Sequence, residues 1–310
     1  MGKYVFGVDI GGTTVKMGLL DTEGNCIDKW EIPTIKENKG ERILPDVAAS
    51  IENKLKERNI DKEDVEGVGV GVPGPVDGEG NVHDAVNLGW GEFNVNEALT
   101  KLTGIKSMAG NDANVAALGE MWKGGGQGYS SMVMVTLGTG VGGGIILNGK
   151  ILAGTTGAGG EIGHIHINDE EEKTCGCGNH GCLEQYASAT GISNLAKKHF
   201  AEWKKDTVLT ENDLSSKAVF DGVKAGDELC IEIAKEFGDY LGKGLAVIAP
   251  IVNPEAFVIG GGVSKAGEVL MDYFVPAFEK YVFKGAKNCK MLLAKLGNDA
   301  GMYGAAKLVL

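Results

Sequence analysis

Three cysteines and a histidine have the residue types and the spacing of a metal-binding cluster. Cys175, Cys177 and Cys182 fall within eight residues, and His164 lies eleven residues before the first of them. Three thiolates and one imidazole complete a tetrahedral zinc shell. The glycines between and after the cysteines let a short loop bend so that its sulfurs face one ion. Because four protein ligands would close the shell, the pattern predicts a structural rather than a catalytic zinc ion.

The cysteines could instead be buried free thiols in the core, or they could form a disulfide. Metal binding is favoured over both, because a glycine-rich run makes a poor core strand. His180 competes with His164 as the fourth ligand. We favour His164, because its spacing places it on a preceding element next to Glu161, and we expect His180 on the loop surface. The remaining cysteines are scattered and are expected to be structural: Cys26, Cys230 and Cys289.

Two carboxylates bracket the same loop. Glu161 lies three residues before His164, and Glu184 lies two residues after Cys182. Together they could hold a polar substrate beside a rigid metal centre.

The composition limits the class of protein. The chain has 310 residues, 43% of them hydrophobic, enough for one large domain or two ordinary ones. A net charge of −12 argues against a nucleic-acid partner, which usually requires a basic patch. There is no run of eighteen apolar residues for a membrane span and no recognisable signal peptide. Six cysteines without a leader indicate a reducing, cytoplasmic location.

Three glycine-rich turns each follow an apolar run that we predict to be a buried strand. Backbone N–H groups in such turns can bind phosphate oxygens, and three together favour nucleotide binding over simple turn chemistry. The candidate nucleotide-binding residues in these turns are Gly11, Gly12, Thr13, Thr14, Gly138, Thr139, Gly140, Gly260, Gly261 and Gly262.

Two charged residues flank the first of these turns. Asp9 ends the first predicted strand, where an acid could order water around Mg²⁺ on a polyphosphate; it could equally be a turn cap. Lys16 could lie near the phosphates or be an exposed strand residue.

The segment 131–147 repeats the chain's opening. Asp9 to Thr13 aligns with Thr136 to Gly140, so that strand, glycine turn and strand recur in the same order. The pattern differs from the strand-to-helix geometry of a P-loop or Rossmann unit. It predicts two similar halves. Helical spacing further predicts helices over 44–58, 112–121, 192–201, 229–248, 266–278 and 299–310.

Asn111 and Asp112 open one of these helices. An ordinary helix cap is one interpretation. The other is a general base that removes a proton from a sugar hydroxyl as the oxygen attacks a γ-phosphate. The residues alone do not decide between the two.

The motifs together resemble the ROK group (repressor, open reading frame, kinase) of the actin-like sugar kinases, and most closely its bacterial glucokinases. The residues that carry the resemblance are, in chain order, Asp9-Ile10-Gly11-Gly12-Thr13, Val72-Pro73-Gly74-Pro75, Asn111-Asp112-Ala113-Asn114, Leu137-Gly138-Thr139-Gly140, Gly160-Glu161-Ile162-Gly163-His164, the loop from Cys175 to Glu184, and Ile259-Gly260-Gly261-Gly262-Val263.

The resemblance implies a duplicated, actin-like (ribonuclease H-like) α/β fold with two domains and a cleft between them. The expected domains are residues 1–117 with 298–310, and residues 118–297.

The resemblance also implies roles for individual residues. Asp112 would be the base on the 6-hydroxyl, and the sugar would be held by Asn87, Asn111, Asp112, Glu161, His164 and Glu184. His164 would use one ring nitrogen on structural zinc and the other on the sugar. The implied activity is phosphorylation of glucose by ATP with Mg²⁺, in a homodimer or homotetramer.

Alternatives remain at this point. A sister kinase for N-acetylglucosamine, N-acetylmannosamine, mannose or fructose would share these motifs, and polyphosphate or ADP could replace ATP. A sugar-responsive repressor would need a preceding DNA-binding domain, for which we expect no room before Lys3. A non-catalytic sugar-binding protein is disfavoured by Asp112. The acidic run from Asn168 to Lys173 departs from the basic or proline-containing segment of many relatives, and we expect a solvated loop there.

Overall fold

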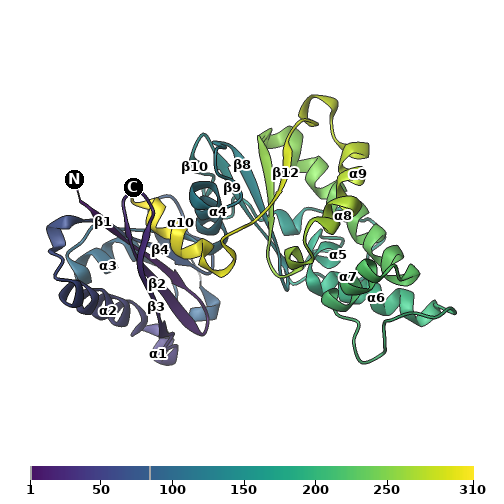
Figure 1. Ribbon diagram of the computed structural model, residues 1–310. Helices are drawn as coiled ribbons and strands as arrows, with labels where there is room; N and C mark the ends of the chain where they lie inside the picture. Colours follow the sequence, from purple (N-terminus) through teal and green to yellow (C-terminus); the bar gives the residue numbers. More distant parts are fainter. Residues whose placement is uncertain (1, 84) are drawn as a thin grey trace. The chain divides into compact units, whose positions relative to one another are not determined.

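The computed structural model describes residues 2–83 and 85–310 (Figure 1). The chain packs into two compact units, the first comprising 1–130, 144–160 and 296–310, and the second 131–143 and 161–295. The expected boundary at residue 117 falls inside α4 (Asp112–Lys123), which is continuous and belongs wholly to the first unit. The expected return at residue 298 lies two residues after Leu296, where the first unit resumes.

The first unit contains, besides α4, the elements β1 (Tyr4–Ile10), β2 (Thr14–Asp21), β3 (Cys26–Pro33), α1 (Glu37–Gly40), α2 (Ile43–Arg58), β4 (Val65–Val72), β5 (Asn81–Val82), β6 (Phe93–Asn94), α3 (Val95–Thr103), β7 (Ser107–Asn111), β10 (Lys150–Ile151) and α10 (Ala300–Leu308). The second contains β8 (Met132–Leu137), α5 (Glu184–Ala187), α6 (Ala189–Glu202), α7 (Ser216–Ala225), α8 (Glu228–Val252), β11 (Ala256–Gly260), α9 (Met271–Tyr281) and β12 (Lys290–Leu293). Strand β9 (Val141–Leu147) begins in the second unit and ends in the first.

The duplication predicted from the sequence is confirmed by two five-stranded sheets of matching topology. Their strand orders are β3-β2-β1-β4-β7 and β10-β9-β8-β11-β12. In the first sheet β1 pairs antiparallel with β2 and parallel with β4, which pairs parallel with β7. In the second, β11 pairs parallel with both β8 and β12. The parallel strands therefore end at a common edge in each sheet.

The first sheet is covered on both faces. Phe6, Val8 and Ile10 on β1 belong to one hydrophobic core with residues of α2 and α3. Val5, the residue before Phe6, faces the opposite side of the sheet and packs instead with Ala306 and its neighbours on α10. This alternation follows from the two-residue period of a strand. Helix α10 also packs along α4, and it therefore supports the helix that begins at Asp112.

One predicted helix starts later than expected. The pattern predicted a helix over 266–278, but two short 3₁₀ turns, η4 (Val263–Ala266) and η5 (Glu268–Leu270), precede α9. Gly267 separates the turns with a φ of 87°, a left-handed conformation that interrupts a right-handed helix.

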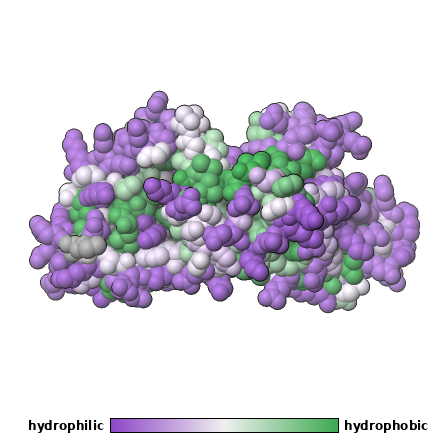
Figure 2. Space-filling model, turned by 90° about the horizontal axis from the view of Figure 1, so that it is seen from above, coloured by the Kyte–Doolittle hydropathy of each residue, from purple (hydrophilic) through white to green (hydrophobic). Residues whose placement is uncertain are grey.

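One face of the surface is mainly hydrophilic. The face shown in Figure 2 is covered mainly by hydrophilic residues, with apolar residues gathered in a few places. Within the described residues, none of the helices combines the length and the hydrophobicity that a membrane span requires.

Candidate active site and metal centre

The parallel strands of the first unit bring three of the predicted motifs to one edge of the sheet. Asp9 on β1 lies opposite Gly71 on β4, and Val72 on β4 lies opposite Asn111 on β7. Because the carboxyl ends of parallel strands share an edge, Asp9 and the Asn111-Asp112 pair lie close together. Ligands of open α/β sheets commonly bind at this edge.

The surroundings of Asp9 disfavour the ionised form of its carboxyl group. Its pKa is raised from 3.8 to about 6: burial is the largest cause, the nearby Asp112 carboxylate acts in the same direction, and Lys16 opposes both. Gly301 of α10 backs this carboxyl: a Cβ there would lie 2.6 Å from the carboxyl carbon, so glycine leaves the space that Asp9 needs. Two acids at this spacing favour a cation, because each carboxylate disfavours ionisation of the other.

Asn111, not Asp112, caps helix α4. Its side-chain oxygen accepts hydrogen bonds from the Ala113 and Asn114 N–H groups at 3.0 and 3.1 Å, and its amide nitrogen donates to the Gly74 carbonyl at 3.0 Å. Asp112 is the first helical residue, and its Oδ1 accepts from the Ala113 N–H at 2.8 Å. The cap thus fixes Asp112 at the positive end of a helix dipole.

The first glycine turn closes the β1–β2 hairpin. The Gly11 N–H donates to the Thr14 carbonyl at 3.0 Å, and Gly12 and Thr13 are exposed between them. Lys16 lies opposite Asp9 across the hairpin, and its ammonium donates to the Asn298 carbonyl at 3.0 Å. Lys16 is therefore held beside the turn rather than simply exposed on the strand.

The other two glycine turns lie side by side in the second unit. Gly260 at the end of β11 pairs with Thr136 near the end of β8. Gly261 has a φ of 83°, and a Cβ there would lie 2.5 Å from the Leu137 carbonyl oxygen. The turn formed by Gly138, Thr139 and Gly140 is tied down by Thr190, whose hydroxyl donates to the Thr139 carbonyl at 2.8 Å.

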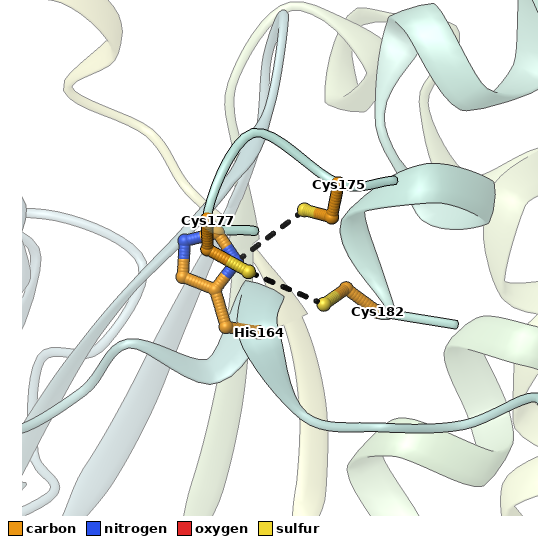
Figure 3. A group of neighbouring side chains, drawn as sticks. All are labelled: His164, Cys175, Cys177 and Cys182. Carbon is orange, nitrogen blue, oxygen red and sulfur yellow. Dashed lines mark hydrogen bonds between the residues drawn. The ribbon is translucent and has the colours of Figure 1, made fainter. Parts of the chain in front are cut away.

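The four predicted metal ligands converge (Figure 3). One ligand atom from each of His164, Cys175, Cys177 and Cys182 lies within 4.8 Å of all the others. The Cys175 sulfur is 3.7 Å from His164 Nδ1, and the Cys177 and Cys182 sulfurs are 3.6 Å apart. Burial raises the pKa of the Cys182 thiol to about 12. His180 is not part of the cluster; its carbonyl oxygen lies 2.8 Å from His166 Nδ1.

The two predicted carboxylates adjoin this cluster on different sides. Glu184, the first residue of α5, accepts the Val141 N–H through Oε2 at 2.9 Å and lies 3.8 Å from the Cys175 sulfur through Oε1. Glu161 is exposed, and its Oε2 is 4.0 Å from His164 Nε2. His164 therefore turns Nδ1 to the sulfurs and Nε2 to Glu161. The Glu161 carboxylate, His164 Nε2 and Glu184 form a polar rim beside the cluster.

The acidic segment is a mainly exposed loop, as expected, in which Asn168 and Glu171 are partly buried. The Tyr186 hydroxyl donates to the Glu171 carboxylate at 2.6 Å, and the Asn168 amide donates to the same hydroxyl at 2.9 Å. Tyr186 in turn stacks on Tyr240 of α8, with ring centroids 3.9 Å apart. The segment and the cysteine loop line a polar cavity of about 570 Å³.

Sequence reasoning missed Gln185. Its side-chain oxygen accepts the Cys182 N–H at 3.0 Å, and its amide nitrogen donates to the Lys173 carbonyl at 2.9 Å. The side chain therefore joins both ends of the cysteine loop. A glutamine next to the motif's Glu184 carries no signal of its own in the sequence, because its partners are backbone groups.

Asn87 lies in the first unit, in the 3₁₀ turn η2 (Val86–Leu88), and its side chain is exposed. The next residue, Leu88, is fully buried in the core beneath the first sheet. This turn presents Asn87 to solvent on a firmly anchored loop.

Comparisons with known proteins agree with these motifs. The model of the ROK family matches residues 5–310. The chain is 43% identical to the glucokinase of Halalkalibacterium halodurans, over 99% of this chain and 95% of that protein, and 34% identical to the glucokinase of Thermotoga maritima, over 98% and 96%. A crystal structure of a ROK family glucokinase from Streptomyces griseus, in complex with glucose and AMPPNP, covers 98% of each chain at 33% identity with a TM-score of 0.75. The duplicated sheets and the full-length match establish that this chain belongs to the ROK family, with its actin-like sugar kinase fold.

Proposed function

We infer that this protein is a glucokinase, which transfers the γ-phosphoryl group of ATP to the 6-hydroxyl of D-glucose and releases glucose 6-phosphate and ADP. The observation that carries this function is the 43% identity to a glucokinase over nearly the whole of both chains. The site residues keep the chemistry that the reaction needs: a carboxylate base, polar groups for a sugar, and glycine turns for phosphates.

Asp112 is proposed as the base. Its carboxylate accepts the proton of the 6-hydroxyl while that oxygen bonds to the γ-phosphorus and the bond from phosphorus to the ADP oxygen breaks. The Asn111 cap supports this role, because it fixes the start of α4 and leaves Asp112 one helical position further on. Asn111 and Asn87 are proposed to hold hydroxyls of the same sugar.

Glu161, His164 and Glu184 are proposed to hold the other end of the sugar. His164 has the geometry for two tasks, since Nδ1 lies at the sulfur cluster and Nε2 faces away toward Glu161. A metal on Nδ1 fixes the tautomer and places the proton on Nε2, which then donates to a sugar hydroxyl.

The glycine turns are proposed to bind the nucleotide. In the second unit, a cavity of about 180 Å³ adjoins Gly262 and is lined by Phe220, Val263 and Ala266, with Lys217, Lys224 and Lys265 at its edge. An apolar floor with cationic edges fits an adenine ring with its phosphates nearby. In the first unit, Thr13, Thr14 and Lys16 are proposed to contact the transferred phosphate.

The cysteine cluster fits zinc. Zinc–sulfur bonds of about 2.3 Å at tetrahedral angles separate two sulfurs by about 3.8 Å. The observed separation of Cys177 and Cys182 is 3.6 Å, and the donor set of three sulfurs and one imidazole nitrogen is typical of structural zinc. The proposed ion orders the loop that carries Glu184 and aims His164.

Asp9 fits a site for Mg²⁺ carried by ATP. Bound there, the ion would neutralise charge on the phosphates. The raised pKa of Asp9 supports the assignment. Ionising this carboxyl costs free energy, and a cation bound beside it would offset that cost.

The assignment is tested by incubating the purified protein with glucose, ATP and Mg²⁺ and coupling the product to glucose-6-phosphate dehydrogenase. ATP-dependent formation of glucose 6-phosphate is expected. Without it the proposed function is wrong. Replacing ATP by polyphosphate or by ADP in the same assay tests the proposed donor.

The cytoplasm is the proposed location, because a reducing compartment keeps the cysteines available as metal ligands. A homodimer or homotetramer remains the expected assembly.

A further inference from the structure

A short segment between β3 and α2 has a strained backbone. Asn38 (φ 51°, ψ 46°) and Lys39 (φ 58°, ψ 35°), both within α1, are left-handed, and Gly40 follows with a φ of 68°. Only glycine adopts this conformation without a steric cost, and asparagine pays less than lysine. A run of such residues persists only where the surrounding structure imposes it.

Trp90 is the residue that holds this turn. Its indole N–H donates to the Gly40 carbonyl at 3.1 Å, in a buried hydrogen bond that spans fifty residues of sequence. The fit is close, since a Cβ at Gly40 would lie 2.6 Å from the Leu88 carbonyl oxygen and 2.8 Å from the indole nitrogen. The strained turn is therefore in close contact with the segment from Leu88 to Trp90.

Asn87 immediately precedes the segment from Leu88 to Trp90. The Ala85 N–H donates to the Trp90 carbonyl at 3.1 Å, which closes a loop around the Asn87 turn. Trp90 is 6% exposed and meets the ring of Phe93 edge to face, with centroids 5.1 Å apart. Asn87 is thus an exposed side chain on a loop whose base is a buried tryptophan.

The base is held by apolar packing and by one side-chain hydrogen bond. A mainly apolar cavity of about 370 Å³ borders the contact and is lined by Gly40, Leu44, Trp90, Phe93 and Leu102 among others. The hydrogen bond from the indole N–H to Gly40 gives the Trp90 ring a directional, polar contact with the strained turn.

The stretch between β3 and α2 also contacts the first glycine turn, through its first residue. The Thr34 hydroxyl donates to the Gly11 carbonyl at 2.7 Å, and the Thr34 N–H donates to the Thr13 carbonyl at 2.9 Å. The stretch from Thr34 to Gly40 therefore connects a candidate phosphate-binding turn with a candidate sugar-binding loop in one unit.

We propose that Trp90 is a positioning residue for glucose: its hydrogen bond to the strained Asn38–Gly40 turn sets the position of Asn87 and thereby the affinity for the sugar. The inference rests on the proposed function, in which Asn87 contacts the sugar. Releasing the contact leaves the base Asp112 untouched, because Asp112 is fixed by α4 and its Asn111 cap.

Gly40→Ala tests the contact, with Gly104→Ala as its matched control. Both glycines are left-handed, with φ of 68° and 72°, but a Cβ at Gly104 meets nothing within 4 Å. The two variants share the backbone cost and differ in the clash with Leu88 and Trp90. We expect Gly40→Ala to raise the KM for glucose about fivefold or more, because the variant loses one hydrogen bond. The kcat and the KM for ATP should stay within about twofold of the parent. Gly104→Ala should leave the KM for glucose unchanged.

Trp90→Phe tests the hydrogen bond without a backbone change, and Trp30→Phe is its control. The Trp30 indole donates to the Ser50 hydroxyl at 2.8 Å, away from the loop. We expect only Trp90→Phe to raise the KM for glucose. Lys39→Gly keeps the contact and removes strain, so it should be more stable than the parent with an unchanged KM. Because these variants do not depend on the clash, they decide the question even where Gly40→Ala fails to fold.

The outcomes separate this inference from the function on which it rests. Loss of glucose phosphorylation in the parent protein would overturn the function. An Asn87→Ala variant with an unchanged KM would remove Asn87 from the sugar site and overturn the inference alone. Equal effects of Gly40→Ala and Gly104→Ala, or of the two tryptophan variants, would reduce Trp90 to a structural residue and likewise overturn it.

Discussion

At the scale of single residues, the proposed chemistry depends on two neighbouring carboxylates with different surroundings. Asp112 is held at a helix start by the Asn111 cap, whereas Asp9 is enclosed by β1, β4 and α10. Burial, and after it the nearby Asp112 carboxylate, raises the pKa of Asp9. Their difference in environment assigns them different proposed tasks, proton acceptance and cation binding.

Asp112→Asn tests the base. The amide keeps the size and the helix-start contact but accepts no proton, so kcat should fall about 10²- to 10⁴-fold while glucose binding is largely kept. Steady-state kinetics and calorimetric glucose binding measure the two effects. Asp227→Asn, at the cap of α8, is the control for loss of a carboxylate at the start of a helix. Activity retained in Asp112→Asn would remove it as the base.

Asp9→Asn tests the electrostatic strain through stability. A raised pKa means that, between the two pKa values, the folded protein keeps a proton that the unfolded chain has released. The contribution of Asp9 to the free energy of unfolding is therefore most favourable below pH 3.8 and is lost as pH rises toward about 6. The shift from 3.8 to about 6 corresponds to about 3 kcal/mol at neutral pH. The variant should therefore be more stable than the parent at pH 7.5, with a smaller gain at pH 4.5. Urea unfolding at both pH values measures the gain; a gain independent of pH would contradict the assigned cause.

At the scale of elements, the cysteine loop is proposed to order the proposed sugar-binding rim. Cys177→Ser removes an exposed ligand, so the metal should be lost, the loop should become sensitive to protease, and the KM for glucose should rise about tenfold or more. Elemental analysis, limited proteolysis and kinetics on one preparation provide the measurement. Cys26→Ser, an exposed cysteine outside the cluster, should change none of them. Full activity in a verified metal-free sample would contradict the role of the ion.

Gln185 should set how tightly that loop holds its metal. Gln185→Ala removes both bonds across the loop and should weaken zinc binding about 10- to 100-fold, as loss of supporting hydrogen bonds around metal ligands typically does. Competition with a chromogenic chelator measures the affinity. Gln127→Ala removes a single exposed bond to the Trp122 carbonyl and is the control. Equal affinity in the two variants would leave Gln185 without this role.

What the sequence predicted, and what it did not, follows from where each signal lies. The cysteine cluster and the glycine turns are encoded by nearby residues, so spacing alone located them. Gln185 binds backbone groups at the two ends of the cysteine loop, and Trp90 binds a backbone carbonyl fifty residues away; a pattern of residue types does not record bonds to backbone groups. The acidic segment was expected to be solvated because its charges dominate the pattern, and it is mainly exposed; the bond from Tyr186 to Glu171, which joins it to α5, has no signal in that pattern. Gly267 shortened a helix because its left-handed φ is not visible in hydrophobic spacing.

At the scale of the whole molecule, the duplicated architecture explains how the candidate residues are distributed. The two five-stranded sheets have matching strand orders, and in each a glycine turn lies at the carboxyl ends of the parallel strands, joined in the first sheet by Asp9. The first unit supplies the proposed base and the turn near Asp9; the second supplies the metal loop and the remaining turns. The homodimer or homotetramer stays a prediction, which light scattering of the purified protein would test.

The most direct test of the central claim is a comparison of kcat/KM for ATP-dependent phosphorylation across hexoses, with zinc content measured on the same preparation. The panel is glucose, mannose, fructose, N-acetylglucosamine and N-acetylmannosamine. A glucokinase with a structural metal should show its highest kcat/KM for glucose and one zinc ion per chain. A higher value for another sugar, or turnover of none, would contradict the assignment to glucose, and glucose turnover without stoichiometric zinc would contradict the metal-ordered sugar site.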